Sequence, residues 1–491
     1  MSWRPLALGT LLLLPLGLLA APEADRVESL PLYGPPPTPQ YSGYLDATNG
    51  CDTATNGPFC KLHYWFAEAE GEDAATKPVI LWLNGGPGSS SVLGFLQENG
   101  PLLINATGGL MENPWAWTKL ANLFVLESPV GVGFSYCANQ VLGQVCQNTD
   151  KFTASAARAA LQDFFATKFP ELAANDFYIT GESYAGVYIP TLTKEILDHA
   201  PELNLRGLAV GDPCTDNTAQ EDSMDALWYS YKYGLVDDAT YDLLWNHCEV
   251  RQPTYLTHHH WGETTKAQVK ERLLRSTHVK DTPDCKLAFR KFLLSTSRGL
   301  SQSWQDLFID DYSLFAPVSD AEDDAMAAYM NRPDVQQALH VTETPIDTWP
   351  YPEAGFDYTK EYDACNDEAD DDALSMIDFY RTIVPDLERV LVYNGDTDPC
   401  VSYEGTRVAV ARVGFAELDG GGYRPWFYNH TATTIDVLME KAVMFGPDLL
   451  VQPTGPQFGG EVVDYEHGLS FLTVHGVRRS SRDACGVDVG G

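Results

Sequence analysis

One segment, at positions 176–188, constrains the fold of this 491-residue chain more than any other. An aromatic and β-branched run leads into the motif GESYAG at 181–186, and an amphipathic run follows at 187–197. This order predicts a strand, a sharp turn and a helix, with Ser183 at the turn and small residues two positions to either side. Such a turn projects the serine hydroxyl above a sheet edge. We therefore expect an acyl-transfer site around Ser183.

Candidate buried strands alternate with helical patterns along much of the chain. The strands are expected at 41–45, 62–67, 78–83, 123–126, 177–180, 205–210, 390–393 and 470–474. The clearest helical patterns are at 152–167 and 187–199. This alternation is typical of an α/β fold with a largely parallel sheet and helices on both faces.

A long region at 214–330 interrupts the alternation with mostly helical patterns. Met224, Leu227, Trp228 and Tyr231 recur at helical spacing, which predicts a packing face. We interpret the region as a cap inserted over the carboxyl edge of the sheet, where sites of α/β proteins lie. The expected divisions are then 1–24, 25–213, 214–330 and 331–491, the second and fourth forming one core.

The first 24 residues have the form of a secretory signal peptide. Arg4 precedes an apolar run at 6–21, and small residues follow. The alternative is a membrane anchor, but the run is short and is interrupted by Pro15 and Gly17. We expect cleavage within 20–24, no membrane attachment afterwards, and a protein that is secreted or delivered to a vacuole or lysosome.

The net charge narrows the range of partners, and the cysteines and sequons predict disulfides and glycans. The net charge of −36 argues against nucleic acid and anionic membranes as partners. Among ten cysteines, Cys51 with Cys60 and Cys137 with Cys146 flank short loops as bridged pairs would, and the other pairings stay open. Sequons at Asn105 and Asn429 predict glycans.

We expect no metal and no cofactor. The histidines at 258–260 are adjacent in a polar stretch, which is more typical of an exposed loop than of a metal site.

Two further motifs fit the needs of an activated serine. A glycine-rich stretch at 82–89 follows the strand expected at 78–83, and its backbone N–H groups could stabilise an oxyanion. An acidic residue should follow a late strand, and Asp396 and Asp398 both lie directly after the strand at 390–393. Turn formation beside Gly395 explains at least one of these two aspartates.

Taken together, these residues resemble the serine carboxypeptidases, a family with lysosomal, vacuolar and plant members. Six motifs occur in the family's order: WLNGGPG at 82–88, ENGP at 98–101, SPVGVGFSY at 128–136, GESYAG at 181–186, NRPDVQQALH at 331–340 and GDTD at 395–398. The resemblance implies an α/β-hydrolase fold with a mixed, mostly parallel sheet and an inserted helical cap. It also implies release of C-terminal residues from peptides or proteins through an acyl-enzyme.

The resemblance assigns roles by position. Ser183 matches the nucleophile and Asp398 the catalytic aspartate, with Asp396 as the second choice. The backbone N–H groups of Gly86 and Tyr184 match the oxyanion hole.

The groups that match the family's site for the substrate's terminal carboxylate are Asn84, Glu182 and Glu98. Two neighbouring carboxyl groups resist ionising together, so one can stay protonated at acidic pH and donate a hydrogen bond. The resemblance therefore implies activity that weakens towards neutral pH.

Two positions depart from the family's pattern. Ser89 stands where the family commonly has cysteine. The family's general base is a histidine a few residues after the last strand, and Arg479 occupies that position. Arginine is always protonated and cannot accept the serine proton. His475 and His467 are the nearby histidines, His475 four residues early and His467 a strand or turn residue.

Two explanations of the missing base remain open. Either the tail from about 478 is not that of the natural protein, for example through a misplaced splice boundary, or the chain is an inactive relative that binds peptides or protects a partner. An acyltransferase of the same family is a further alternative. Side-chain preference and oligomeric state, including a homodimer, are left open.

Overall fold

The computed structural model describes residues 22–220, 223, 226–248, 250, 280–296, 321–349, 356–365, 373–398, 401–428, 434–435 and 457–476. Most of the predicted signal peptide, at 1–21, lies outside these residues. Among the described residues, no helix has the length and apolar character that a membrane crossing requires.

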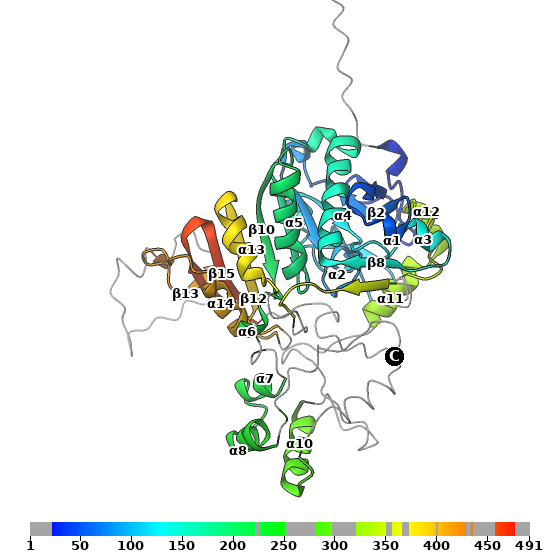
Figure 1. Cartoon of the computed structure of the whole chain (residues 1–491). Helices are drawn as coiled ribbons and strands as arrows, with labels where there is room; N and C mark the ends of the chain where they lie inside the picture. The colour runs from blue at the N-terminus through cyan, green and yellow to red at the C-terminus, as the bar shows by residue number, and fades with distance from the viewer. Residues whose placement is uncertain are drawn as a thin grey trace, which may run out of the picture.

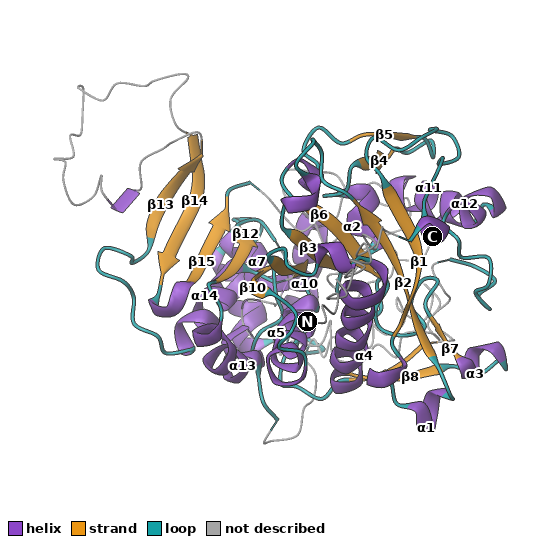
Figure 2. Ribbon diagram, turned by 90° about the horizontal axis from the view of Figure 1, so that it is seen from above, coloured by secondary structure: helices purple, strands orange, loops and turns teal. Residues whose placement is uncertain are grey.

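A large mixed sheet forms the centre of the molecule (Figure 2). In the described part of the chain its strands follow the order β1-β2-β6-β3-β9-β10-β12-β15-β14-β13, with β7 pairing β2. The strands from β6 to β15 run parallel, whereas both ends of the sheet are antiparallel. Their bounds are β1 Gln40–Asp46, β2 Cys60–Ala67, β3 Val79–Leu83, β6 Asn122–Leu126, β7 Tyr136–Cys137, β9 Phe177–Glu182, β10 Leu205–Gly211, β12 Arg389–Gly395, β13 Arg424–Tyr428, β14 Gln457–Asp464 and β15 Leu469–Val474.

Helices cover both faces of the sheet, as the alternating pattern predicts (Figure 2). One face packs against α4 (Asp150–Asp163), α5 (Ala185–His199), α13 (Met376–Ile383) and α14 (Tyr403–Arg412). The other face packs against α2 (Val92–Gln97), α11 (Ala321–Met330) and α12 (Pro333–Ala338). A sheet buried on both faces explains why its strands are apolar along almost their whole length.

The alternation of side chains along β2 shows how the two cores are built. Tyr64 and Phe66 point into the core that contains α4 and α5, and Trp65 and Ala67 point into the core that contains α2 and α11. All four side chains are fully buried. Because successive residues of a strand face opposite sides, one continuous apolar run serves both cores.

Most helices between β10 and α11 form a separate lobe, namely α7 (Ala226–Lys232), α8 (Asp238–Asp242), the π-helical segment η8 (Leu243–His247) and α10 (Pro283–Thr296). The short helix α6 (Asn217–Gln220) instead packs against α14 and the first core. In Figure 1, α7, α8 and α10 stand below the sheet. A small core of their own includes Leu227, Leu244 and Phe292.

Helix α11 lies just before the predicted C-terminal limit of the cap, at 330. Its residues Met326, Tyr329 and Met330 pack in the sheet's second core. The predicted domain limits remain predictions.

All eight strands expected from the sequence are present, and the strands that were missed are short or irregular. The missed strands are β4 (Leu102–Ile104), β5 (Leu110–Glu112), β7, β8 (Cys146–Thr149), β11 (Phe356–Thr359), β13 and β14. β13 contains Pro425, and β14 contains Gly459 and Gly460, residues that weaken a strand signal. A Cβ at Gly459 would clash with the Trp426 ring, so packing against β13 requires that glycine.

The two disulfides expected from local spacing, Cys51–Cys60 and Cys137–Cys146, are both formed. Two long-range bridges, Cys214–Cys365 and Cys248–Cys285, join them. Cys400 and Cys485 lie outside the described residues.

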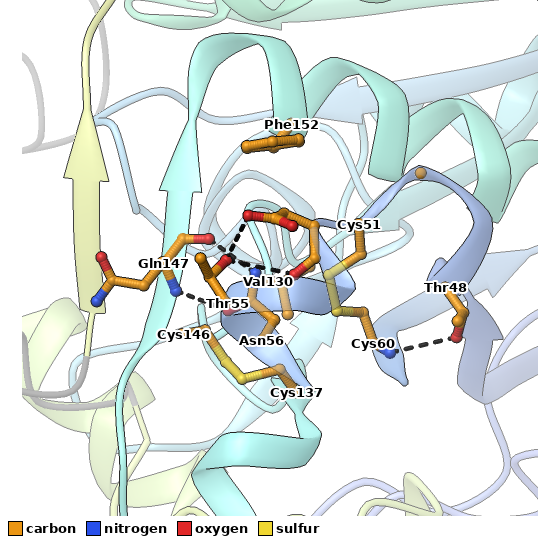
Figure 3. The surroundings of a disulfide bond; sticks show 12 residues. Thr48, Cys51, Thr55, Asn56, Cys60, Val130, Cys137, Cys146, Gln147 and Phe152 are labelled. Atoms are coloured by element: carbon orange, nitrogen blue, oxygen red, sulfur yellow. Dashed lines mark hydrogen bonds between the residues drawn. A yellow bond between two sulfur atoms is a disulfide. The ribbon is translucent and has the colours of Figure 1, made fainter. Parts of the chain in front are cut away.

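One asparagine joins the loops of the first two disulfides (Figure 3). Asn56 Nδ2 donates to the Gln147 carbonyl at 2.9 Å, and Asn56 Oδ1 accepts the Gln147 N–H at 2.7 Å. The Asn56 side chain is 1% exposed. Its amide thus satisfies a backbone donor and a backbone acceptor at the start of β8, the strand that leads into α4.

We expect Asn56→Ala to lower the free energy of unfolding by about 1–3 kcal/mol, because both Gln147 backbone groups lose their partner. Urea unfolding followed by tryptophan fluorescence measures the change. Asn246→Ala is the control, since Asn246 makes a hydrogen bond of 2.8 Å to Asp242 at an exposed position. Equal effects of the two substitutions would contradict the buried bridge.

Candidate active site

Ser183 occupies the turn between β9 and α5 and has a left-handed backbone conformation, with φ of 65°. Its N–H donates to the Gly211 carbonyl at 3.0 Å, and its own carbonyl accepts the N–H groups of Cys214 at 3.0 Å and Gly186 at 2.7 Å. A Cβ at Gly181 would clash with the Leu83 carbonyl. These contacts explain the sequence pattern, because the strained turn needs small neighbours and fixed hydrogen bonds.

The glycine-rich loop after β3 lies directly against Ser183. A Cβ at Gly85 would clash with the Tyr184 backbone nitrogen and would lie 2.9 Å from Ser183 Oγ. Gly86 follows with φ of 110°, a conformation that favours glycine. The loop thus leaves room beside both the hydroxyl and the Tyr184 N–H, which is where an oxyanion hole made with Gly86 would have to lie.

The predicted carboxylate-binding residues Asn84 and Glu182 are in contact. Asn84 Nδ2 donates to Glu182 Oε1 at 3.1 Å, and both side chains are buried. Asn84 Oδ1 accepts the Trp82 Nε1–H at 2.9 Å and the Gly94 N–H at 3.1 Å. Because two donors hold the oxygen, the amide NH₂ group must face Glu182.

Glu98 belongs to the same group of side chains. The buried phenol of Tyr393 has a pKa raised above its ordinary value by burial and by the carboxylates of Asp212, Glu182 and Glu98. Glu98 and Glu182 therefore both act on this phenol, although they lie 84 positions apart in the sequence. The sequence predicted Tyr393 only as part of a strand, and these neighbouring carboxylates were not anticipated.

The loop after β12 carries the two candidate acids, and the structure separates their surroundings. Asp396 Oδ2 lies 2.7 Å from His475 Nδ1, and Asp396 Oδ1 accepts the Gly476 N–H at 2.8 Å. Both oxygens of Asp396 are thus bound to the end of β15. Asp398 is buried, and its Oδ1 accepts the Val401 N–H at 2.7 Å. This arrangement favours Asp398 as the acid and Asp396 as a structural link.

Both nearby histidines adjoin β15, a strand that does not pair with β9. His475 follows β15 directly, and β15 lies three strand positions from β9 in the sheet, about 14 Å at ~4.8 Å per position. His467 precedes β15, at the opposite edge of the sheet, with its ring 5.0 Å from that of Phe415. Four extended residues span about 13 Å, so a base four residues after His475 could reach from β15 back to the region of β9. That position is Arg479, which lies outside the described residues.

The buried carboxylate of Asp150, behind the turn, binds Tyr184, and no sequence pattern indicated this contact. Asp150 Oδ1 accepts the hydroxyls of Tyr184 at 2.8 Å and Tyr358 at 2.6 Å, and Oδ2 accepts the Glu361 N–H at 2.5 Å. Burial raises the pKa of Asp150, and the three donors act in the opposite direction. Asp150 therefore links Tyr184, the residue after Ser183, to the segment at 356–365.

The same segment is also tied covalently to the turn. Cys365 forms a disulfide with Cys214, whose N–H donates to the Ser183 carbonyl. The turn is thus held from two sides by residues distant in the sequence.

Comparison with known proteins identifies the family. The family model described as "Serine carboxypeptidase" matches residues 31–477. The chain belongs to the serine carboxypeptidase family. It is 31% identical to serine carboxypeptidase 24 of Arabidopsis thaliana, covering 92% of this chain and 88% of the relative. It is 29% identical to the lysosomal protective protein of Mus musculus, covering 93% and 90%.

A solved structure supports the fold independently. The Kex1 prohormone-processing carboxypeptidase of Saccharomyces cerevisiae matches with a TM-score of 0.62 over 96% of this chain and 94% of that chain, at 18% identity. The expected α/β-hydrolase fold is therefore confirmed. The residues that match the family model end at 477, two positions before Arg479.

The remaining site predictions concern surfaces. Asn105 lies in the turn between β4 and β5, where its Oδ1 accepts the Thr107 hydroxyl at 2.6 Å. Asn429 and the histidines at 258–260 lie outside the described residues. In the described part of the chain, no group of three or more His, Cys, Asp or Glu residues could hold a metal ion.

We expect Asp150→Asn to lower the free energy of unfolding by about 1–3 kcal/mol, because an amide NH₂ would face a hydroxyl or N–H donor. Urea unfolding checks this cost. Asp163→Asn is the matched control at the other end of α4, where Asp163 accepts the Asp46 N–H at 2.9 Å in an exposed position. If the two variants unfold at the same urea concentration, the stabilising role of the buried Asp150 hydrogen bonds is contradicted.

Proposed function

We propose that this chain is a serine-type carboxypeptidase that releases C-terminal residues from peptides or proteins through an acyl-enzyme on Ser183. The observation that carries the proposal is the contact of Asn84 with Glu182, the residue that directly precedes Ser183. In a substrate peptide, the terminal carboxylate and the last peptide bond are separated by one residue. In this protein, Glu182, which would bind that carboxylate, and Ser183, which would attack that bond, are adjacent, with Cα atoms about 3.8 Å apart. The two spacings are therefore similar.

The proposed reaction assigns a task to each part of the site. Asn84 Nδ2 and a protonated carboxyl of the Glu182 and Glu98 pair would donate to the substrate carboxylate. Ser183 Oγ would attack the last peptide carbonyl and form the C–O bond of the tetrahedral intermediate. The N–H groups of Gly86 and Tyr184 would stabilise its oxyanion.

Collapse of the intermediate would expel the terminal amino acid, which needs a proton on its amine. Water would then hydrolyse the acyl-enzyme. A base oriented by Asp398 would move these protons, since a serine hydroxyl is a weak nucleophile without one.

A secretory destination, with a vacuole or lysosome as one end point, fits the covalent structure. The described residues contain four disulfides, and disulfides persist mainly in oxidising compartments. One relative carries the word lysosomal in its name. Both observations support the proposal that the mature chain works outside the cytosol.

Labelling and turnover together test the proposed activity. We expect a fluorophosphonate probe to label Ser183 in the natural full-length protein. We also expect cleavage of an N-blocked dipeptide acid but little cleavage of its C-terminal amide, because the amide lacks the anion that Asn84 and Glu182 would bind. Ser183→Ala controls for other nucleophiles.

Each alternative gives a different result. Absence of labelling and turnover in a folded chain would contradict the proposed enzymatic activity and favour a peptide-binding or protective protein. Transfer to an added alcohol in preference to water would identify an acyltransferase.

The pH profile tests the carboxyl pair separately. Cleavage of the dipeptide acid should weaken as pH rises from acid to neutral, because ionisation of both Glu98 and Glu182 replaces a hydrogen bond to the substrate with repulsion. Initial rates at saturating and at low substrate give kcat and KM, and the loss should lie mainly in KM. A flat profile from about pH 4 to 8 contradicts the shared-proton arrangement.

A further inference from the structure

Helix α7 of the cap contacts the loop that carries Asp398. The Tyr229 hydroxyl donates to the Thr397 carbonyl at 3.0 Å, and the Tyr233 hydroxyl donates to the Asp396 carbonyl. The two rings lie against each other, with centroids 4.6 Å apart. Two tyrosines one helical turn apart therefore hold two successive carbonyls of one loop, directly before the candidate acid.

The base of the cap is also fixed to the helix that follows this loop. Gln220 Nε2 donates to the Thr406 hydroxyl at 3.1 Å, and Lys232 pairs with Glu404 at 3.2 Å. A Cβ at Gly405 would clash with the hydroxyl of Ser223. The segment that leads into α7 is therefore packed closely against α14, and the Lys232–Glu404 pair joins α7 itself to that helix.

The same helix is part of the cap's own core. Leu227 is 2% exposed and packs in the cluster that contains Leu244 and Phe292. The Cys248–Cys285 disulfide lies in that cluster and closes the lobe. One face of α7 thus belongs to the cap, while Tyr229 and Tyr233 belong to the contact with the sheet edge.

We propose that Tyr229 and Tyr233 are positioning residues, through which the cap holds the loop of Asp396 to Asp398 in place. The inference rests on the proposed role of Asp398 as the acid. The other sides of the loop are held by the core, because Asp212 accepts the Gly395 N–H at 2.9 Å and the Asp396 N–H donates to the Val474 carbonyl at 3.1 Å. The cap adds the two tyrosine hydroxyls to these contacts, so we expect a displacement of α7 to shift the loop that carries Asp398.

The contact holds over the working pH range. Burial, together with the neighbouring Tyr229, Tyr403, Asp396 and Glu404, raises the pKa of Tyr233 above its ordinary value. The phenol stays protonated and remains a donor from acidic to neutral pH. Any pH dependence of activity therefore arises from groups other than this contact.

Amide hydrogen exchange tests the contact without requiring activity. In the full-length Tyr229→Phe/Tyr233→Phe variant, we expect amides at 395–398 to exchange faster, by roughly fivefold for each lost hydrogen bond. The cap's own amides at 238–248 should keep their wild-type rates. Tyr231→Phe is the matched control, since Tyr231 lies on the same helix but stacks on Tyr241 at 4.0 Å.

Unchanged exchange at 395–398, or an equal rise at 238–248, overturns the proposal. A functional measurement then separates positioning from cap folding. The rate constant of fluorophosphonate labelling and kcat should fall in the double variant while KM for the dipeptide stays close to wild type. If wild-type protein is not labelled, the proposed function fails, and the exchange rates alone decide whether the cap holds the loop.

Discussion

The left-handed backbone of Ser183 is the constraint on which the rest of the site depends. For a residue with a Cβ, this conformation costs about 1–2 kcal/mol, so it persists only where the surroundings enforce it. Backbone hydrogen bonds with Gly211, Cys214 and Gly186 enforce it here. Cys214 is joined to Cys365, and Tyr184 is joined to Asp150, so segments from three parts of the chain hold one turn.

The geometry of the turn also places the recognition groups. Glu182 ends β9, and Asn84 follows the neighbouring β3, so the parallel pairing of these strands brings the two side chains to the same sheet edge. The loop after β12 lies at the same edge, because β9, β10 and β12 are parallel and their carboxyl ends face the same way. The fold therefore brings Ser183, the predicted carboxylate-binding residues and the candidate acid to one edge of the sheet through strand order alone. Hydroxyls of the cap then make contact with the acid's loop.

Local patterns predicted the parts of the site whose neighbours are close in sequence or lie in successive strands. The turn at Ser183 and the short loop at Cys51–Cys60 follow from spacing and residue type alone. Asp150 and Tyr358 lie 208 positions apart, and their contact depends on the pairing of β8 with β11, two short strands without a clear pattern. The sequence does not separate Asp396 from Asp398, since both have equivalent turn chemistry, and their different surroundings depend on where β15 ends.

Recognition of a free C-terminal carboxylate beside Ser183 is the central claim, and a binding measurement tests it without a functioning base. Calorimetry of the Ser183→Ala protein at pH 5 compares an N-blocked dipeptide acid with its amide. Tighter binding of the acid by at least about tenfold is predicted, since hydrogen bonds to a charged group contribute about 1.5–3 kcal/mol each. Adding Asn84→Ala should remove most of that preference. Equal affinities for acid and amide would contradict the account.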